Sequence, residues 1–172
     1  MPRLSKKKLI SKKTQLKAQP QSLEAEESVL GSALLKPELI TEIKEFIPKA
    51  DIFYYDTSRI IWNKMLKMND DHEEIDAVTI MAKLSDSEKK KVTAYYITGL
   101  PQSIPSTANV SSYANIVLEK FLQREIINTT FEIQKSAFDN DENFDTLIES
   151  IKKRTDELSS LTPNKEPTLD SI

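Results

Sequence analysis

Apolar residues recur every three or four positions through the first hundred residues, which is the spacing of one face of an α-helix. This pattern predicts helices over residues 22–35, 37–47, 57–68, 76–84 and 85–97. No long run alternates between apolar and polar residues, as a half-buried strand would. The chain is therefore predicted to be all-α.

Residues with known cap preferences stand where these helices should begin and end. Ser22 and Asp76 can each accept a hydrogen bond from a free amide of a first helical turn, and Asp56 or Thr57 can do the same for the third helix. Ser85 is followed by Glu88 at the spacing of a capping box. Gly99 and the two prolines at 37 and 48 are suited to helix ends.

A proline-marked turn precedes the longest predicted helix. Pro105 fixes its own φ and keeps Ile104 out of the helical region, so a helix can start only after it. Ser106, Thr107 and Asn109 can cap that start. Neither proline nor glycine occurs from residue 110 to 162, which leaves room for one very long helix or a helical hairpin.

A hairpin is the interpretation that the polar residues favour. A helix over 107–138 would be about 45 Å long, more than a small globular head can cover. The polar residues 139–143 predict a turn, and the apolar positions of 144–161 predict a second helix that folds back antiparallel.

The first hairpin helix carries two apolar stripes. The first stripe is Leu122, Ile126, Ile133 and Ala137, and the second is Ile127, Phe131 and Phe138. One partner helix can cover only one stripe, so the other should meet a second chain, since exposed apolar patches usually mark interfaces. Phe131 and Phe138 are the predicted self-association residues.

Composition narrows the class of protein. The 172 residues include 38% hydrophobic and 30% charged residues, which suits elongated helices with much solvated surface. The absence of cysteine excludes a disulfide framework and a thiolate metal site. No apolar run approaches the ~20 residues that cross a membrane, and the N-terminus has no apolar signal core. We therefore expect a cytoplasmic protein without a membrane partner.

The net charge of −3 conceals a strong asymmetry. Residues 1–17 carry seven basic residues and no acidic one, so the remainder sums to −10. Residues 1–19 are expected to be a disordered, solvated tail, or an arm that contacts DNA phosphates without sequence specificity. The candidate phosphate contacts are Lys6, Lys7, Lys8, Lys12 and Lys13.

Side chains that could support catalysis or bind metal do not form a complete site. Residues 139–143 begin like a calcium loop, but Phe144 and Ser150 stand where that loop needs Gly and Glu. The single histidine, His72, lies in an acidic segment without a second His or Cys to complete a metal site or a nucleophile to form a triad. No catalytic residue, metal or cofactor is predicted.

Aromatic residues in the first half are expected to divide between core and surface. Trp62 falls at a helical core position. Tyr95 and Tyr96 are adjacent and must point to different sides of a helix, so one is expected in the core while the other can face a partner.

Four segments follow one another in a recognisable order. They are residues 19–31 (QPQSLEAEESVLG), 51–62 (DIFYYDTSRIIW), 75–79 (IDAVT) and 104–127 (IPSTANVSSYANIVLEKFLQREII). Together they resemble the N-terminal domain of DnaB-type replicative DNA helicases, and the resemblance covers about residues 19–161.

The resemblance implies an organisation and a set of partners. It implies a six-helix globular head over 20–104, a long antiparallel helical hairpin over 105–161 and the start of a linker over 162–172. Such domains pair into dimers that form a trimer of dimers, a collar on a hexameric motor that recruits primase and, in some systems, a helicase loader. Carried over to matching positions, the primase contacts are Glu24, Tyr96, Ile127 and Ile133.

The motor itself is not expected in these residues. A phosphate-binding P-loop needs at least two glycines followed by Lys and Ser or Thr. Only Gly31 and Gly99 are present, and neither precedes such a lysine, so this chain is not expected to hydrolyse ATP. Two alternatives remain: a stand-alone regulator from a phage or mobile element that binds a host helicase, and an unrelated helical nucleic-acid-binding protein with a basic tail.

Overall fold

The computed structural model describes residues 18–104, 106–139 and 143–160, and within them every regular element is helical. The α-helices are α2 (Leu23–Leu35), α3 (Ile40–Phe46), α4 (Asp56–Asp70), α5 (Ala77–Lys83), α6 (Asp86–Lys89), α7 (Ala94–Gly99), α8 (Val110–Asp139) and α9 (Phe144–Ser160). Four 3₁₀ turns join them: η1 (Pro37–Leu39), η2 (Ala50–Ile52), η3 (Leu100–Gln102) and η4 (Thr107–Asn109). The predicted all-α fold is confirmed.

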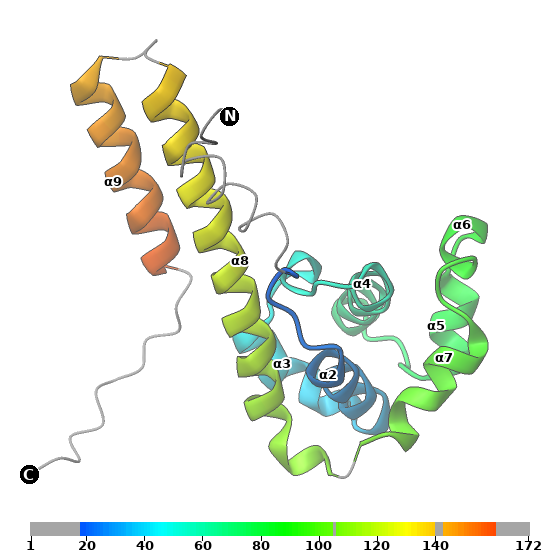
Figure 1. Cartoon of the computed structure of the whole chain (residues 1–172). Coiled ribbons are helices and arrows are strands. Elements are labelled where there is room, and N and C mark those ends of the chain that lie inside the picture. The colour runs from blue at the N-terminus through cyan, green and yellow to red at the C-terminus, as the bar shows by residue number, and fades with distance from the viewer. Residues whose placement is uncertain (1–17, 105, 140–142, 161–172) are drawn as a thin grey trace, which may run out of the picture.

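The helices form a head and a projecting hairpin (Figure 1). Helices α2 to α7 make up the head, and the first half of α8 packs against α2 and α3. The second half of α8 leaves the head, and α9 runs back beside it. The six-helix head and the antiparallel hairpin therefore have the order that the sequence predicted.

Helix α2 lies at the centre of the head. All but one of residues 25–33 are buried, so this helix is enclosed on every side rather than on one apolar face. Its Gly31 has no room for a side chain, because a Cβ there would lie 2.5 Å from the backbone oxygen of Leu100 in η3. Gly31 thus sets how closely α2 and η3 approach.

Gly31→Ala is expected to lower the free energy of unfolding by up to about 2 kcal/mol. Alanine favours a helix over glycine by about 1 kcal/mol, but forcing a methyl group against an immobile backbone costs about 1–3 kcal/mol. Gly99→Ala is the matched control, since nothing lies within 4 Å of a Cβ at that position. Urea unfolding of both variants checks this, and a Gly31→Ala protein as stable as Gly99→Ala would contradict it.

The core of the head forms around Trp62, as predicted. The Trp62 ring is fully buried, and its Nε1 donates a hydrogen bond of 3.1 Å to the Ile47 backbone oxygen. The ring of Phe53 packs against it with a centroid distance of 6.0 Å. Tyr95 is 90% exposed and Tyr96 is half-buried, so the expected division between these neighbours also holds.

The predicted caps Ser22 and Asp76 are present, whereas the cap predicted at Asp56 or Thr57 is misplaced. The Ser22 hydroxyl accepts from the Ala25 amide, and the Asp76 carboxylate accepts from the amides of Val78 and Thr79. Helix α4, however, already begins at Asp56, with Tyr55 as its N-cap. The Asp56 carboxylate is used differently: it forms a 2.9 Å ion pair with Lys91.

The single helix predicted over 85–97 is wrong. The Ser85–Glu88 capping box forms, but α6 ends at Lys89 and α7 begins at Ala94. Thr93 starts the new helix because its hydroxyl accepts the Tyr96 amide, and Val92 between the two helices is buried. Helix α7 ends at Gly99 as predicted, but Gly99 has a helical φ of −77° and the chain passes directly into η3.

Several predictions fall outside the described residues. They concern the basic residues Lys6, Lys7, Lys8, Lys12 and Lys13, the turn proline Pro105, the middle of the hairpin turn at 140–142, and the linker over 162–172.

Candidate docking surfaces

The projecting hairpin buries little of its own surface. In the described part of the chain, Arg124 is the last fully buried residue, and no later residue of α8 or α9 falls below the half-buried range. Helix pairs gain most of their stability from packing an apolar face. The hairpin is therefore a candidate docking surface.

Polar side chains line much of the space between α8 and α9. Glu132 pairs with Arg154 of α9, and Glu125 and Thr129 line the same seam with Leu158. These α8 positions are separated by four and three residues, which places them on one helix side. The contact within the hairpin thus depends on polar as well as apolar side chains.

The expectation that α9 covers the first apolar stripe is wrong for half of that stripe. Leu122 and Ile133 are half-buried, but Ile126 is 54% exposed and Ala137 is also exposed. The α8 residues that line the space beside α9 are instead Glu125, Thr129 and Glu132.

The second stripe, which we call the outer face, consists of Ile127, Phe131 and Phe138. These residues are four and seven positions apart, so they share one side of α8, roughly opposite the seam with α9. Their exposed fractions are 47%, 66% and 67%. Aligned apolar side chains on a solvent-facing helix are typical of interaction surfaces, so the outer face is a candidate for one.

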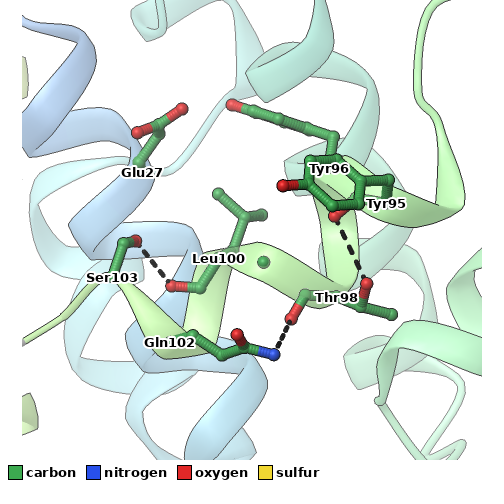
Figure 2. Close-up of a pocket in the computed structure, with 8 residues that line it drawn as sticks. Glu27, Tyr95, Tyr96, Thr98, Leu100, Gln102 and Ser103 are labelled. Atoms are coloured by element: carbon green, nitrogen blue, oxygen red, sulfur yellow. Dashed lines mark hydrogen bonds between the residues drawn. The ribbon is translucent and has the colours of Figure 1, made fainter.

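A second candidate surface is a hollow of about 250 Å³ in the head (Figure 2). It lies between α2, which contributes Glu27, and the segment of α7 and η3. Its lining residues are Glu27, Tyr95, Tyr96, Thr98, Gly99, Leu100, Gln102 and Ser103.

The Tyr96 side chain extends toward Glu27 in this hollow (Figure 2). Burial, followed by the charge of Glu27, raises the pKa of the Tyr96 phenol to about 12. The hydroxyl therefore stays protonated at neutral pH. Its oxygen is buried, and among the described residues none meets it with the geometry of a hydrogen bond.

The four predicted primase-contact residues do not form one surface within a single chain. Glu24 is exposed in the first turn of α2, and Tyr96 lies in the hollow. Ile127 lies on the outer face, while Ile133 is half-buried on the same helix. Figure 1 places α7 and the hairpin on opposite sides of the molecule, so the structure joins Tyr96 with Glu27 but not with the two isoleucines.

Two buried charged residues, Glu26 and Arg124, were not predicted from the sequence; we call them the polar clamp. The Arg124 guanidinium donates to the backbone oxygens of Pro20 (2.8 Å) and Ile52 (2.7 Å). The Glu26 carboxylate accepts from the amides of Tyr54 (2.6 Å) and Tyr55 (3.3 Å). Arg124 also lies 5.4 Å from the Tyr54 ring centroid, so the clamp joins α2, the segment around residues 52–55 and α8.

A signal for the clamp existed in the sequence. Arg124 follows the buried Val117 by seven positions and Phe121 by three, which puts a charge on the apolar side of α8. A charged residue on such a side must find partners, because an unpaired buried charge is very costly.

Burial raises the pKa of the Glu26 carboxyl above its ordinary value of 4.5, although the amides of Tyr54 and Tyr55 oppose the shift. An acid with a raised folded pKa binds more protons when folded, so its contribution to stability falls as pH rises from about 4.5 through the folded pKa. Glu26→Gln should therefore gain stability relative to the wild type over that range.

Urea midpoints of wild type and Glu26→Gln between pH 4 and pH 7 measure this difference. Asp56, Asp76 and Glu88 have lowered pKa values, so their contribution to stability changes with pH in the opposite direction. They are present in both proteins, so their effect cancels in the comparison. If the urea midpoints of the two proteins differed by the same amount at every pH, the pKa of Glu26 would be the same in the folded and unfolded states.

Within the described residues, no three acidic or histidine side chains gather in a way that could hold a metal ion. No helix among them has the length and apolar content to cross a bilayer.

The sequence is similar to those of known proteins. The chain is 33% identical over 142 residues to the replicative DNA helicase DnaB of Geobacillus stearothermophilus, covering 81% of this chain and 31% of the relative. It is 32% identical over 136 residues to the replicative DNA helicase DnaC of Bacillus subtilis, covering 78% and 30%. The chain thus spans about a third of the length of these relatives.

Solved structures share the fold. The N-terminal domain of DnaB helicase from Mycobacterium tuberculosis matches with a TM-score of 0.75 and 26% identity, covering 81% of this chain and 99% of that one. A DnaB-like replicative helicase, described with its interactions with primase, matches with a TM-score of 0.61 and 23% identity, covering 84% and 32%. Residues 18–119 match the family described as the DnaB-like helicase N terminal domain, and the chain therefore belongs to that family.

Proposed function

We propose that this chain is an assembly and docking module in DNA replication: it joins helicase subunits to one another and binds primase. The exposed outer face of the hairpin is the observation that carries the assembly role. The family membership supplies the context, because the relatives are replicative DNA helicases. The bacterial cytoplasm is the proposed compartment.

The assembly role follows from what the hairpin lacks. Its helices contain no fully buried residue beyond Arg124 in the part that the structure describes. The outer face adds Ile127, Phe131 and Phe138 to the exposed surface. A second copy of the same chain offers an identical apolar stripe, so two hairpins can cover each other in a symmetric dimer, the unit of a trimer of dimers.

The docking role is supported by two features. A structurally similar DnaB-like helicase is described with its interactions with primase. In this chain, Tyr96 lines a hollow whose rim carries the exposed Tyr95 ring, and aromatic residues are enriched where proteins dock. Glu24, Tyr96, Ile127 and Ile133 remain the proposed primase contacts. A helicase loader and non-specific DNA contact by the basic tail remain predictions from the sequence.

Primase binding by Tyr96→Ala and Ile133→Ala tests the docking role. Both variants should bind the cognate primase at least about tenfold more weakly, the effect of losing about 1.4 kcal/mol of contact energy. Because both side chains are half-buried, each variant should also lose some stability, less than the ~2–5 kcal/mol of a fully buried apolar truncation.

Val78→Ala is the control, since Val78 is 76% exposed on α5. Calorimetric titration with primase, paired with melting curves, separates weaker docking from loss of fold. Wild-type affinity in both variants would remove these residues from the primase site while leaving the family membership intact.

A further inference from the structure

The hollow beside α2 contains one carboxylate that has no positively charged partner. Glu27 is half-buried, and no described Lys, Arg or His forms an ion pair with it. None of the residues that line the hollow is basic. The charge of Glu27 acts on the Tyr96 phenol, which is the polar group that it approaches (Figure 2).

The other polar side chains of the hollow are turned to their own backbone. The Thr98 hydroxyl donates to the Ala94 oxygen at 2.8 Å, and the Ser103 hydroxyl donates to the Leu100 oxygen at 2.9 Å. The Gln102 amide donates to the Thr98 oxygen at 3.4 Å. A ligand entering the hollow thus meets the Glu27 carboxylate as its one charged partner.

The Tyr95 ring completes the arrangement. Its side chain is 90% exposed although it lines the hollow, so its ring face is open to a ligand. Cations bind favourably over the faces of aromatic rings. The volume of about 250 Å³ is smaller than the ~300–1,000 Å³ of pockets for small-molecule ligands, which suits a single side chain.

We propose that this hollow is a socket for an arginine side chain of the docking partner, held by the Glu27 carboxylate and stacked on Tyr95. Arginine fits better than lysine because its planar guanidinium can stack on a ring and bind a carboxylate through two parallel hydrogen bonds. This inference rests on the proposed function, since it assigns the chemistry that primase must present to the hollow.

Glu27→Gln tests the socket with little disturbance of shape. Titrations of the full chain with cognate primase should show binding about tenfold weaker or more for this variant, because a charge-assisted pair becomes neutral. The dependence of affinity on salt should also become shallower, since one ion pair is lost. Glu45→Gln, an exposed carboxylate on α3, is the matched control and should bind as the wild type does.

A second series identifies the partner side chain. Each arginine and lysine of the primase domain that binds the helicase is replaced by alanine in turn. One arginine variant should bind the wild-type chain weakly but show no further loss with Glu27→Gln, which is the sign of a direct pair.

The outcomes are distinct. Equal affinity and equal salt dependence for wild type and Glu27→Gln would overturn the socket and leave primase docking in place, as would a coupled lysine in place of an arginine. Failure of the wild-type chain to bind primase at all would overturn the docking role together with the socket. Circular dichroism of Glu27→Gln confirms that any loss of binding occurs in a folded protein.

Discussion

Phe131→Asp is expected to be monomeric at concentrations at which the wild-type chain self-associates. Phe131 is 66% exposed at the middle of the outer face, between Ile127 and Phe138. Burying such a side chain contributes about 1.5–3 kcal/mol. A symmetric dimer uses the same position twice, so the substitution should weaken association by about 3–6 kcal/mol, or two to four orders of magnitude in the dissociation constant.

Sedimentation velocity at tens of micromolar measures this effect. Asn128→Asp is the matched control, because Asn128 is exposed on the same helix but outside the outer face, so it adds the same charge without removing apolar surface. Ile127→Asp should behave like Phe131→Asp. A wild-type chain that is strictly monomeric in this range would count against the assembly role of the outer face.

Arg124→Met is expected to cause the largest loss of folding stability, about 3–5 kcal/mol, which is typical when one member of a buried charged pair is removed. Arg124 is 6% exposed and binds two backbone oxygens, of Pro20 and Ile52. Methionine retains much of the apolar stem but leaves those oxygens and the Glu26 carboxylate without their donor and counter-charge.

The double variant Glu26→Gln/Arg124→Met should recover part of that loss, because removing both buried charges relieves the uncompensated carboxylate. Arg59→Met is the control: its Nε also donates to a backbone oxygen, that of Phe53, but its side chain is 40% exposed. Urea unfolding followed by circular dichroism measures the free energy of unfolding of the two single variants and the double variant. An Arg124→Met protein no less stable than Arg59→Met would show that the polar clamp contributes little.

Local signals in the sequence predicted most of the helices because those helices are specified locally. Ser22 and Asp76 cap their helices as expected, and the long helix begins after Pro105. The break between α6 and α7 was missed because it depends on burying Val92 and on the Thr93 cap. A tertiary contact overrides a local helical pattern in such cases.

The candidate surfaces were predicted less completely, for a physical reason. The outer face could be predicted because Ile127, Phe131 and Phe138 repeat at helical spacing. The hollow brings Glu27 next to Tyr96, two residues far apart in the chain, and only packing of α2 against the η3 segment creates that contact. The first stripe was assigned to the hairpin contact, although the neighbouring polar positions line the space between α8 and α9.

The polar clamp attaches the continuous helix α8 to the head near its middle. The helix is 30 residues long, about 45 Å, and about half of it lies beyond Arg124. A tilt of about 10° of this outer half at Arg124 would move its far end by about 4 Å. A small change in packing around Glu26 and Arg124 would therefore cause a larger displacement at the hairpin tip, and so alter the geometry of the proposed contact between two hairpins.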